Sequence, residues 1–239
     1  MGGGGAYLCR EMIRFWSLLL VFGLAACAFG SSNPDGQSVL RSAGQALASV
    51  HSVSADVKFG PGIAVQGLTL SSATAKIALP ASSDAVFKVR QGDFLVDVRV
   101  VTVGGVGYIQ LPFSKFTQLT AVQSAELPDL ATLFDSAHGL PAVMASGSSV
   151  RWEASEKVGG VDTDRVAAVY SPDQIGSVLA SSAARPAANV KAVWWVGKSD
   201  HLLRRVVLTG PLLAPGKDVS VDITLHDFNA PVTIVAPAV

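Results

Sequence analysis

The stretch Phe94-Leu-Val-Asp-Val-Arg-Val-Val-Thr-Val103 decides the fold class of this chain. Asp97 and Arg99 alternate with apolar side chains, which is the two-residue period of a strand with one polar and one apolar face. The apolar positions on the second face are Val96, Val98 and Val100. We therefore expect an antiparallel sheet whose apolar face is covered by another layer.

The same period continues on both sides of this stretch. Before it lie Ser54 to Phe59, Ala75 to Leu79 and Ala85 to Arg90; after the turn signal Gly104-Gly105 lies Val106 to Leu111. Further along lie Val150 to Lys157, Thr163 to Tyr170, Lys191 to Val196, Leu202 to Leu208 and Asp218 to His226. Short strands separated by glycine turns predict a long antiparallel meander built from hairpins.

Helical spacing is found in segments that interrupt the strands. Pro34 to Val50 is predicted as a helix, with Asn33 as N-cap and Pro34 at the first helical position. Leu127 to Asp135, a short turn at Ala142 to Ala145, and Pro172 to Ser181 complete the predicted helices. The expected fold class is α+β, an antiparallel sheet with helices covering its apolar face.

The N-terminal region reads as a lipoprotein signal. Arg10 and Arg14 precede the apolar run Phe15 to Leu24, which is too short to cross a bilayer. The run ends in Leu24-Ala-Ala-Cys27, which looks like a lipobox. The prediction is a signal peptide at 1–26, a lipidated Cys27 that starts a tether at 27–33, and a single lipid-binding domain at 34–239. The alternatives are an ordinary secretory signal cut near Ala26, or a membrane helix.

Composition narrows the classes of function. The chain has 239 residues with 49% apolar side chains, enough for one domain with a sizeable core. Removing Arg10, Arg14 and Glu11 with the signal leaves 16 basic and 17 acidic side chains out of 18 and 18. A near-neutral domain argues against nucleic-acid binding. Only Cys27 remains after processing, so an internal disulfide is not expected.

Catalytic signatures are missing from the sequence. It has no Gly-x-Ser-x-Gly elbow, no His-Glu-x-x-His and no glycine-rich phosphate loop. The four histidines (51, 138, 201 and 226) are scattered, and each reads as a surface or turn residue. We therefore expect no enzyme activity, no metal and no cofactor. A lipid-active hydrolase would need a base within hydrogen-bond reach of a serine, which a sequence does not show.

Several motifs, in their order and spacing, resemble the LppX/LprA/LprF/LprG family of mycobacterial lipoproteins. They are the lipobox, Val158 to Val166, Ala184 to Ala187, Val193 to Leu203, and Val219 to Pro231 with its ending Asp227-Phe-Asn-Ala-Pro-Val232. The resemblance covers nearly the whole mature chain. It implies a half-barrel, a curved antiparallel sheet similar to LolA and LolB, with helices packed over its concave apolar face.

The resemblance also implies a function. Members of the family bind the acyl chains of triacylated glycolipids, phthiocerol-type lipids or triacylglycerols and move them from the plasma membrane toward the outer envelope. A monomer anchored on the outer, periplasmic face of the plasma membrane is expected, with some copies released or in the cell wall. Partners would be the lipid, a membrane lipid exporter and host Toll-like receptor 2. The alternative is a structural or interaction envelope lipoprotein, a surface antigen and Toll-like receptor 2 ligand, without lipid cargo.

The apolar positions of the strands and helices give a candidate lining for a lipid cavity. It comprises Val57, Phe59, Ile77, Leu79, Phe87, Val89, Val96, Val98, Val100, Leu130, Leu133, Phe134, Val143 and Met144. For any single one of these side chains, the favoured interpretation is an ordinary core residue. For Trp194-Trp195, in a predicted strand, we expect one ring in the core and the other on the surface; the alternative is a wet rim that faces the membrane.

Overall fold

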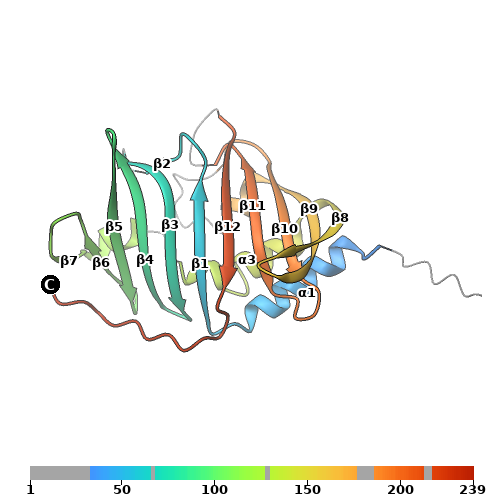
Figure 1. Ribbon diagram of the computed structural model, residues 1–239, viewed down its shortest axis with the longest axis horizontal. Coiled ribbons are helices and arrows are strands. Elements are labelled where there is room, and N and C mark those ends of the chain that lie inside the picture. Colours follow the sequence, from blue (N-terminus) through green and yellow to red (C-terminus); the bar gives the residue numbers. More distant parts are fainter. Residues whose placement is uncertain (1–32, 66–67, 127–129, 177–185, 213–216) are drawn as a thin grey trace, which may run out of the picture. The chain divides into compact units, whose positions relative to one another are not determined.

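The computed structural model describes residues 33–65, 68–126, 130–176, 186–212 and 217–239 (Figure 1). Residues Pro34–Val239 form one compact unit. The predicted signal peptide, Cys27 and all of the tether except Asn33 lie outside the described residues. Within the described ranges, no helix has both the length and the apolar character that a bilayer crossing requires.

The strands form one antiparallel sheet. In chain order they are β1 (Ser52–Phe59), β2 (Ala64–Val65), β3 (Leu68–Ala78), β4 (Ser82–Gln91), β5 (Phe94–Val103), β6 (Val106–Gln110), β7 (Phe116–Gln118), β8 (Ser148–Val158), β9 (Val161–Tyr170), β10 (Val190–Gly197), β11 (Leu203–Gly210) and β12 (Val219–His226). Their spatial order is β7-β6-β5-β4-β3-β1-β12-β11-β10-β9-β8, with β2 paired to β3 (Figure 1). The sheet is curved and unclosed, which confirms the predicted fold class.

Strand β5 has the bounds that its alternation predicted. Val96 pairs with Val89, Val98 with Phe87, and Val100 with Ala85, so its apolar side continues onto β4. On the other side, Lys88 Nζ lies 2.9 Å from Asp97 Oδ1, and the Arg99 guanidinium donates to both carboxylate oxygens of Asp84. The two faces of the strand are therefore separated into apolar contacts and cross-strand ion pairs, as the sequence indicated.

Helix α1 (Gly36–Ala48) is shorter at both ends than the predicted Pro34–Val50. The predicted N-cap, Asn33, is wrong, because the Asp35 carboxylate accepts hydrogen bonds from the amide and hydroxyl of Ser38. Pro34 therefore lies outside the helix. The helix buries Leu40, Ala43, Gly44 and Leu47.

Two short helices differ from the helices that were predicted to cover the sheet. Helix α2 (Ala121–Glu126) was not expected, and the predicted helix Leu127–Asp135 contains only the 3₁₀ turn η1 (Thr132–Phe134), with 127–129 outside the described residues. The chain turns after η1 because Asp135 Oδ1 accepts from the amides of Ala137 and His138. These two bonds also lower the pKa of Asp135.

The remaining helices agree better with the sequence. Helix α3 (Leu140–Ser146) contains the predicted turn Ala142–Ala145, with Gly139 as N-cap. Helix α4 (Pro172–Gly176) is the beginning of the predicted Pro172–Ser181, whose remainder falls in the undescribed range 177–185. α1 packs against α3 and on strands β8, β9 and β10. A side chain on Gly44 would come within 2.5 Å of the Pro141 carbonyl oxygen, so α1 and α3 approach closely because this residue has no Cβ.

Candidate functional site

The strand registers align apolar side chains in rows that cross the sheet. One row reads Val98, Phe87, Ala73, Val57, Ile223, Val206, Trp194 and Val166, passing through β5, β4, β3, β1, β12, β11, β10 and β9. Strands that are far apart in sequence thus contribute to one continuous surface, which we call the apolar face. Such a surface can be filled by the protein's own helices or can receive an apolar ligand.

The centre of the apolar face is made of small side chains. Ala55 pairs with Ala75, Ala75 pairs with Ala85, and Ala85 pairs with Val100, while Ala73 lies in the neighbouring row. We call Ala55, Ala73, Ala75 and Ala85 the alanine floor; all four are buried. Because a methyl group takes up little depth, side chains here project less far from the sheet than Trp194 does, and Ala55, Ala75 and Ala85 are covered as part of the core cluster.

The alanine floor was not among the predicted site residues. Its local signal is the alternation Ala73-Thr-Ala75-Lys in β3, in which the apolar positions are alanine rather than valine or leucine. That signal becomes informative only when the registers bring Ala55 and Ala85 to either side.

The predicted lining residues divide by burial. Ile77, Val89, Val98, Phe134, Val143 and Met144 are buried, whereas Val57, Phe59, Leu79, Phe87, Val96, Val100, Leu130 and Leu133 are half-buried. Ile77, Phe134, Val143 and Met144 belong to the contiguous core cluster, and Val89 and Val98 are buried without belonging to it. The β1, β4 and β5 candidates share the apolar face, but nothing in the structure tests whether a lipid touches them.

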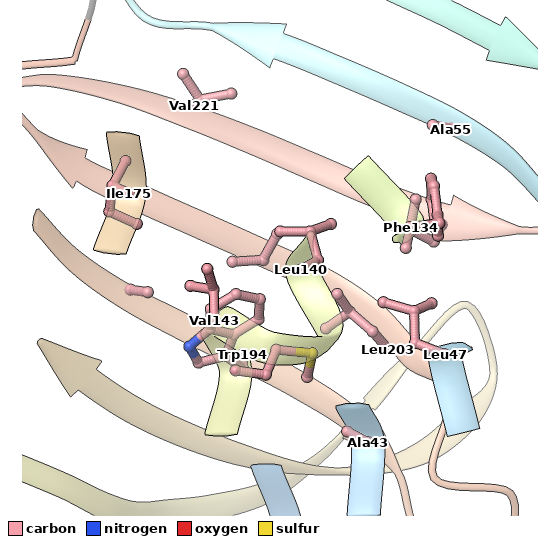
Figure 2. Close-up of a cluster of buried hydrophobic side chains, with 14 of the residues drawn as sticks. Ala43, Leu47, Ala55, Phe134, Leu140, Val143, Ile175, Trp194, Leu203 and Val221 are labelled. Atoms are coloured by element: carbon pink, nitrogen blue, oxygen red, sulfur yellow. The ribbon is translucent and has the colours of Figure 1, made fainter. Parts of the chain in front are cut away.

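The region beneath α3 is closely filled (Figure 2). Val143, Leu140 and the fully buried Met144 lie with Trp194 in the core cluster. The Tyr170 ring meets the Trp194 ring edge-on, with centroids 5.8 Å apart, and its hydroxyl donates to the Met144 carbonyl oxygen. Burial raises the pKa of Tyr170 well above its usual value, so this hydroxyl stays protonated. In this structure Val143 and Met144 therefore act as core residues.

The tandem tryptophans lie on opposite faces of the sheet. Trp194 is fully buried in the core, whereas Trp195 packs under the Arg205 guanidinium, 4.8 Å from its ring centroid, and is 8% exposed. Its Nε1 donates to Glu156, and that hydrogen bond is the main reason that the pKa of Glu156 is lowered. The expectation that one ring faces the core is confirmed for Trp194, but the expected surface ring and the alternative of a wet rim are both wrong, because Trp195 is also buried.

A polar hollow of about 390 Å³ lies on the face opposite the apolar one. Asp56 and Lys58 of β1 line it together with Arg205 and Asp222, whose charged groups are 2.7 Å apart. Its charged lining does not suit an acyl chain, because the ions would lose hydration without gaining a partner.

Two observations concern metal binding and acid–base chemistry among the described residues. Within those ranges, no group of three or more His, Cys, Asp and Glu side chains is placed to hold a metal ion. His226 lies between two carboxylates, with Nε2 3.2 Å from Asp56 and Nδ1 2.9 Å from Asp227. These are partly exposed side-chain contacts on the surface, which fits a structural role.

Comparison with known proteins gives the same architecture. The model of the LppX_LprAFG lipoprotein family matches residues 35–234. The lipoarabinomannan carrier protein LprG of Mycolicibacterium hassiacum is 25% identical over 189 residues, covering 79% of this chain and 71% of that protein. Two crystal structures share the fold. LprF from Mycobacterium bovis has a TM-score of 0.67 and 20% identity over 87% of this chain and 100% of its own. LppX from Mycobacterium tuberculosis has a TM-score of 0.61 and 18% identity over 85% and 100%.

The family match spans most of the chain and lies within the compact unit Pro34–Val239. The predicted lipoprotein fold and the predicted family therefore agree, and the chain belongs to the LppX_LprAFG lipoprotein family.

Proposed function

We propose that this protein is a membrane-anchored carrier that holds lipid acyl chains on its apolar face, above the alanine floor. The observation that carries the proposal is the uninterrupted apolar row from Val98 to Val166, which passes through Ala73 beside the other alanines of the floor and is flanked by half-buried Val96 and Val100. The predicted lining residues of β1, β3, β4 and β5 are the proposed contacts.

Burial of acyl chains supplies enough free energy for such binding. Each methylene group removed from water contributes about 0.8 kcal/mol, so a chain of ordinary length contributes on the order of 10 kcal/mol before the ordering costs. The interaction needs shape and an apolar surface rather than a reactive group. A carrier also has to release its cargo, and half-buried side chains at the edge of the site favour exchange over permanent enclosure.

The anchor in this proposal is the acylated Cys27. The signal peptide at 1–26 is removed, the tether at 27–33 follows, and the domain at 34–239 stays at the outer face of the plasma membrane. Three acyl chains hold a protein far more firmly than one, whose membrane binding is marginal. The short tether keeps the carrier close to the bilayer from which it takes lipid.

The proposed cargo is an acylated glycolipid. The curated relative is named a carrier of lipoarabinomannan, which supports glycolipids as the class to test first. Transport toward the outer envelope, loading by a membrane lipid exporter and recognition by Toll-like receptor 2 follow from the resemblance and stay predictions.

Native mass spectrometry tests the proposal. The chain from residue 28 onward, expressed without its signal in a mycobacterial host, should carry about one diacyl or triacyl lipid per protein, identified after organic extraction. A clean lipid-free mass, with no uptake when envelope lipids are added, would refute the carrier and favour the interaction lipoprotein without cargo. The same chain carrying Phe113→Ser, a change at an exposed loop residue, is the matched control for lipid that is lost during purification.

A further inference from the structure

Large apolar side chains are exposed at one end of strands β3 and β5, on either side of β4. Phe94 is 75% exposed, Leu95 is 52% exposed and Leu68 is 37% exposed. We call these three residues the apolar tip. Exposed apolar residues occur singly on most surfaces, but a group of large ones at one strand end is typical of an interaction site.

The registers place the three residues at the same level of the sheet. Phe94 pairs with Gln91 and Leu95 with Arg90 on β4, while Arg90 also pairs with Thr69, the neighbour of Leu68. Figure 1 shows the β4–β5 hairpin at this end of the sheet. The apolar tip therefore comprises exposed side chains of β3 and β5 on either side of β4, with Leu95 on the side of the sheet that carries Asp97 and Arg99.

Phe94 connects the apolar tip to the apolar face. Side chains alternate along β5, so Phe94 lies on the same side as Val96, Val98 and Val100. Burial increases inward along this line, from the 75% exposed Phe94, through the half-buried Val96, to Val98 at 7% exposed. Val100 then pairs with Ala85 of the alanine floor. An acyl chain that moves along this line passes no charged side chain of β5.

A cation lies beside the tip. Arg90 is exposed and pairs across the strands with Leu95. Among the described residues its guanidinium takes part in no ion pair, whereas its neighbours Lys88 and Arg99 are neutralised by Asp97 and Asp84. A guanidinium next to exposed apolar side chains is the combination that interfacial membrane anchors use. The exposed Asp93, one residue before Phe94, offsets part of the attraction of Arg90 to anionic lipids, so apolar burial is the main contribution.

We infer that the apolar tip docks into the surface of a lipid bilayer, with Phe94, Leu95 and Leu68 at the boundary of headgroups and acyl chains and Arg90 at the headgroups. The tip is then also the passage by which an acyl chain moves between the bilayer and the apolar face. This second part rests on the proposed function, whereas docking does not.

Vesicle binding tests the docking. The non-acylated chain from residue 28 onward is mixed with vesicles of phosphatidylcholine, with and without phosphatidylglycerol, and the bound fraction is measured by co-flotation. The double variant Phe94→Ser, Leu95→Ser should bind at least about tenfold more weakly than the wild type, because two large apolar side chains no longer enter the bilayer. Arg90→Gln should lose only the extra binding that phosphatidylglycerol gives.

Val122→Ser is the matched control. Val122 of α2 is 72% exposed, close to the 75% of Phe94, but α2 lies toward the other end of β5, because Ser124 Oγ accepts a hydrogen bond from the Gly107 amide and Gly107 pairs with Thr102. This variant should bind vesicles like the wild type. Wild-type binding by the double variant, or an equal loss in Val122→Ser, would overturn the docking at the tip. Circular dichroism and thermal unfolding check that the variants stay folded, which their exposure predicts.

The docking and the carrier can fail separately. If the wild-type protein is lipid-free in mass spectrometry but binds vesicles through the tip, the proposed carrier function is refuted and the docking is supported. For the passage, lipid-loaded protein is mixed with acceptor vesicles: the double variant should hold the same cargo as the wild type and release it about tenfold more slowly. Equal release rates would overturn the passage.

Discussion

The substitution Ala85→Leu separates a lipid site from an ordinary core. Ala85 is 2% exposed and lies between Ala75 and Val100 in the alanine floor. Leucine adds about three methylene-sized groups at this point. If an acyl chain lies above the floor, the new side chain displaces a similar length of it, which weakens binding by about 2.4 kcal/mol, or roughly 60-fold. The lipid-free protein should keep its stability, because the added groups occupy space that the ligand otherwise fills.

A packed core above Ala85 predicts a different effect of the same substitution. If the space above Ala85 is packed with protein, leucine strains the core and lowers the free energy of unfolding by about 1–3 kcal/mol. Titration with a fluorescent acyl-chain probe gives the affinity, and urea unfolding of delipidated protein gives the stability. Ala43→Leu is the control of the same size, at a fully buried position of α1; it should lose stability and keep its affinity. Wild-type probe affinity in Ala85→Leu, together with a stability loss of that size, would refute the lipid site.

Three further predictions concern stability and anchoring. Met144→Ala should lower the free energy of unfolding by about 2–5 kcal/mol in urea, because Met144 is fully buried beside Trp194; a loss below about 1 kcal/mol would show that α3 is loosely packed. Cys27→Ala should move the protein from the membrane to the soluble fraction, and persistent membrane association would count against the lipobox. The Ser38 hydrogen bonds lower the pKa of Asp35, so its contribution to stability is complete above the ordinary aspartate pKa and is lost as the pH falls through the lowered value. Asp35→Asn should therefore remove that part of the pH dependence of thermal unfolding and keep most of the cap, whereas Asp35→Ala loses the cap as well; identical pH profiles in all three proteins would contradict this assignment.

Short sequence motifs, taken in their order and spacing, were enough to identify the family. The predicted resemblance is confirmed by the family match over residues 35–234, and the prediction that the chain is not an enzyme is confirmed at the level of that family, whose curated relative is a carrier. The identity of the cargo was not predictable, because a surface that holds acyl chains by apolar contact carries no motif for a particular headgroup.

Local helix signals were less reliable than strand signals. The N-cap of α1 is Asp35 rather than the predicted Asn33, because the carboxylate of Asp35 accepts hydrogen bonds from the amide and hydroxyl of Ser38. The predicted helix before Gly139 reduces to η1 within the described residues, where Asp135 caps the amides of the following turn. Short helices have few internal hydrogen bonds, so side-chain bonds and packing decide whether they form.

The sequence by itself determined the two-faced strands, because alternation along one strand is a local property: Asp97 and Arg99 had to lie opposite Val96 and Val98. Only the tertiary structure decided which strands meet. β1 lies between β3 and β12, and Ser54 pairs with His226 near the other end of the chain. The alanine floor and the line from Phe94 to Ala85 exist only in these registers. The physical reason is that strand register is set by the joint burial of side chains from distant segments, which no local pattern contains.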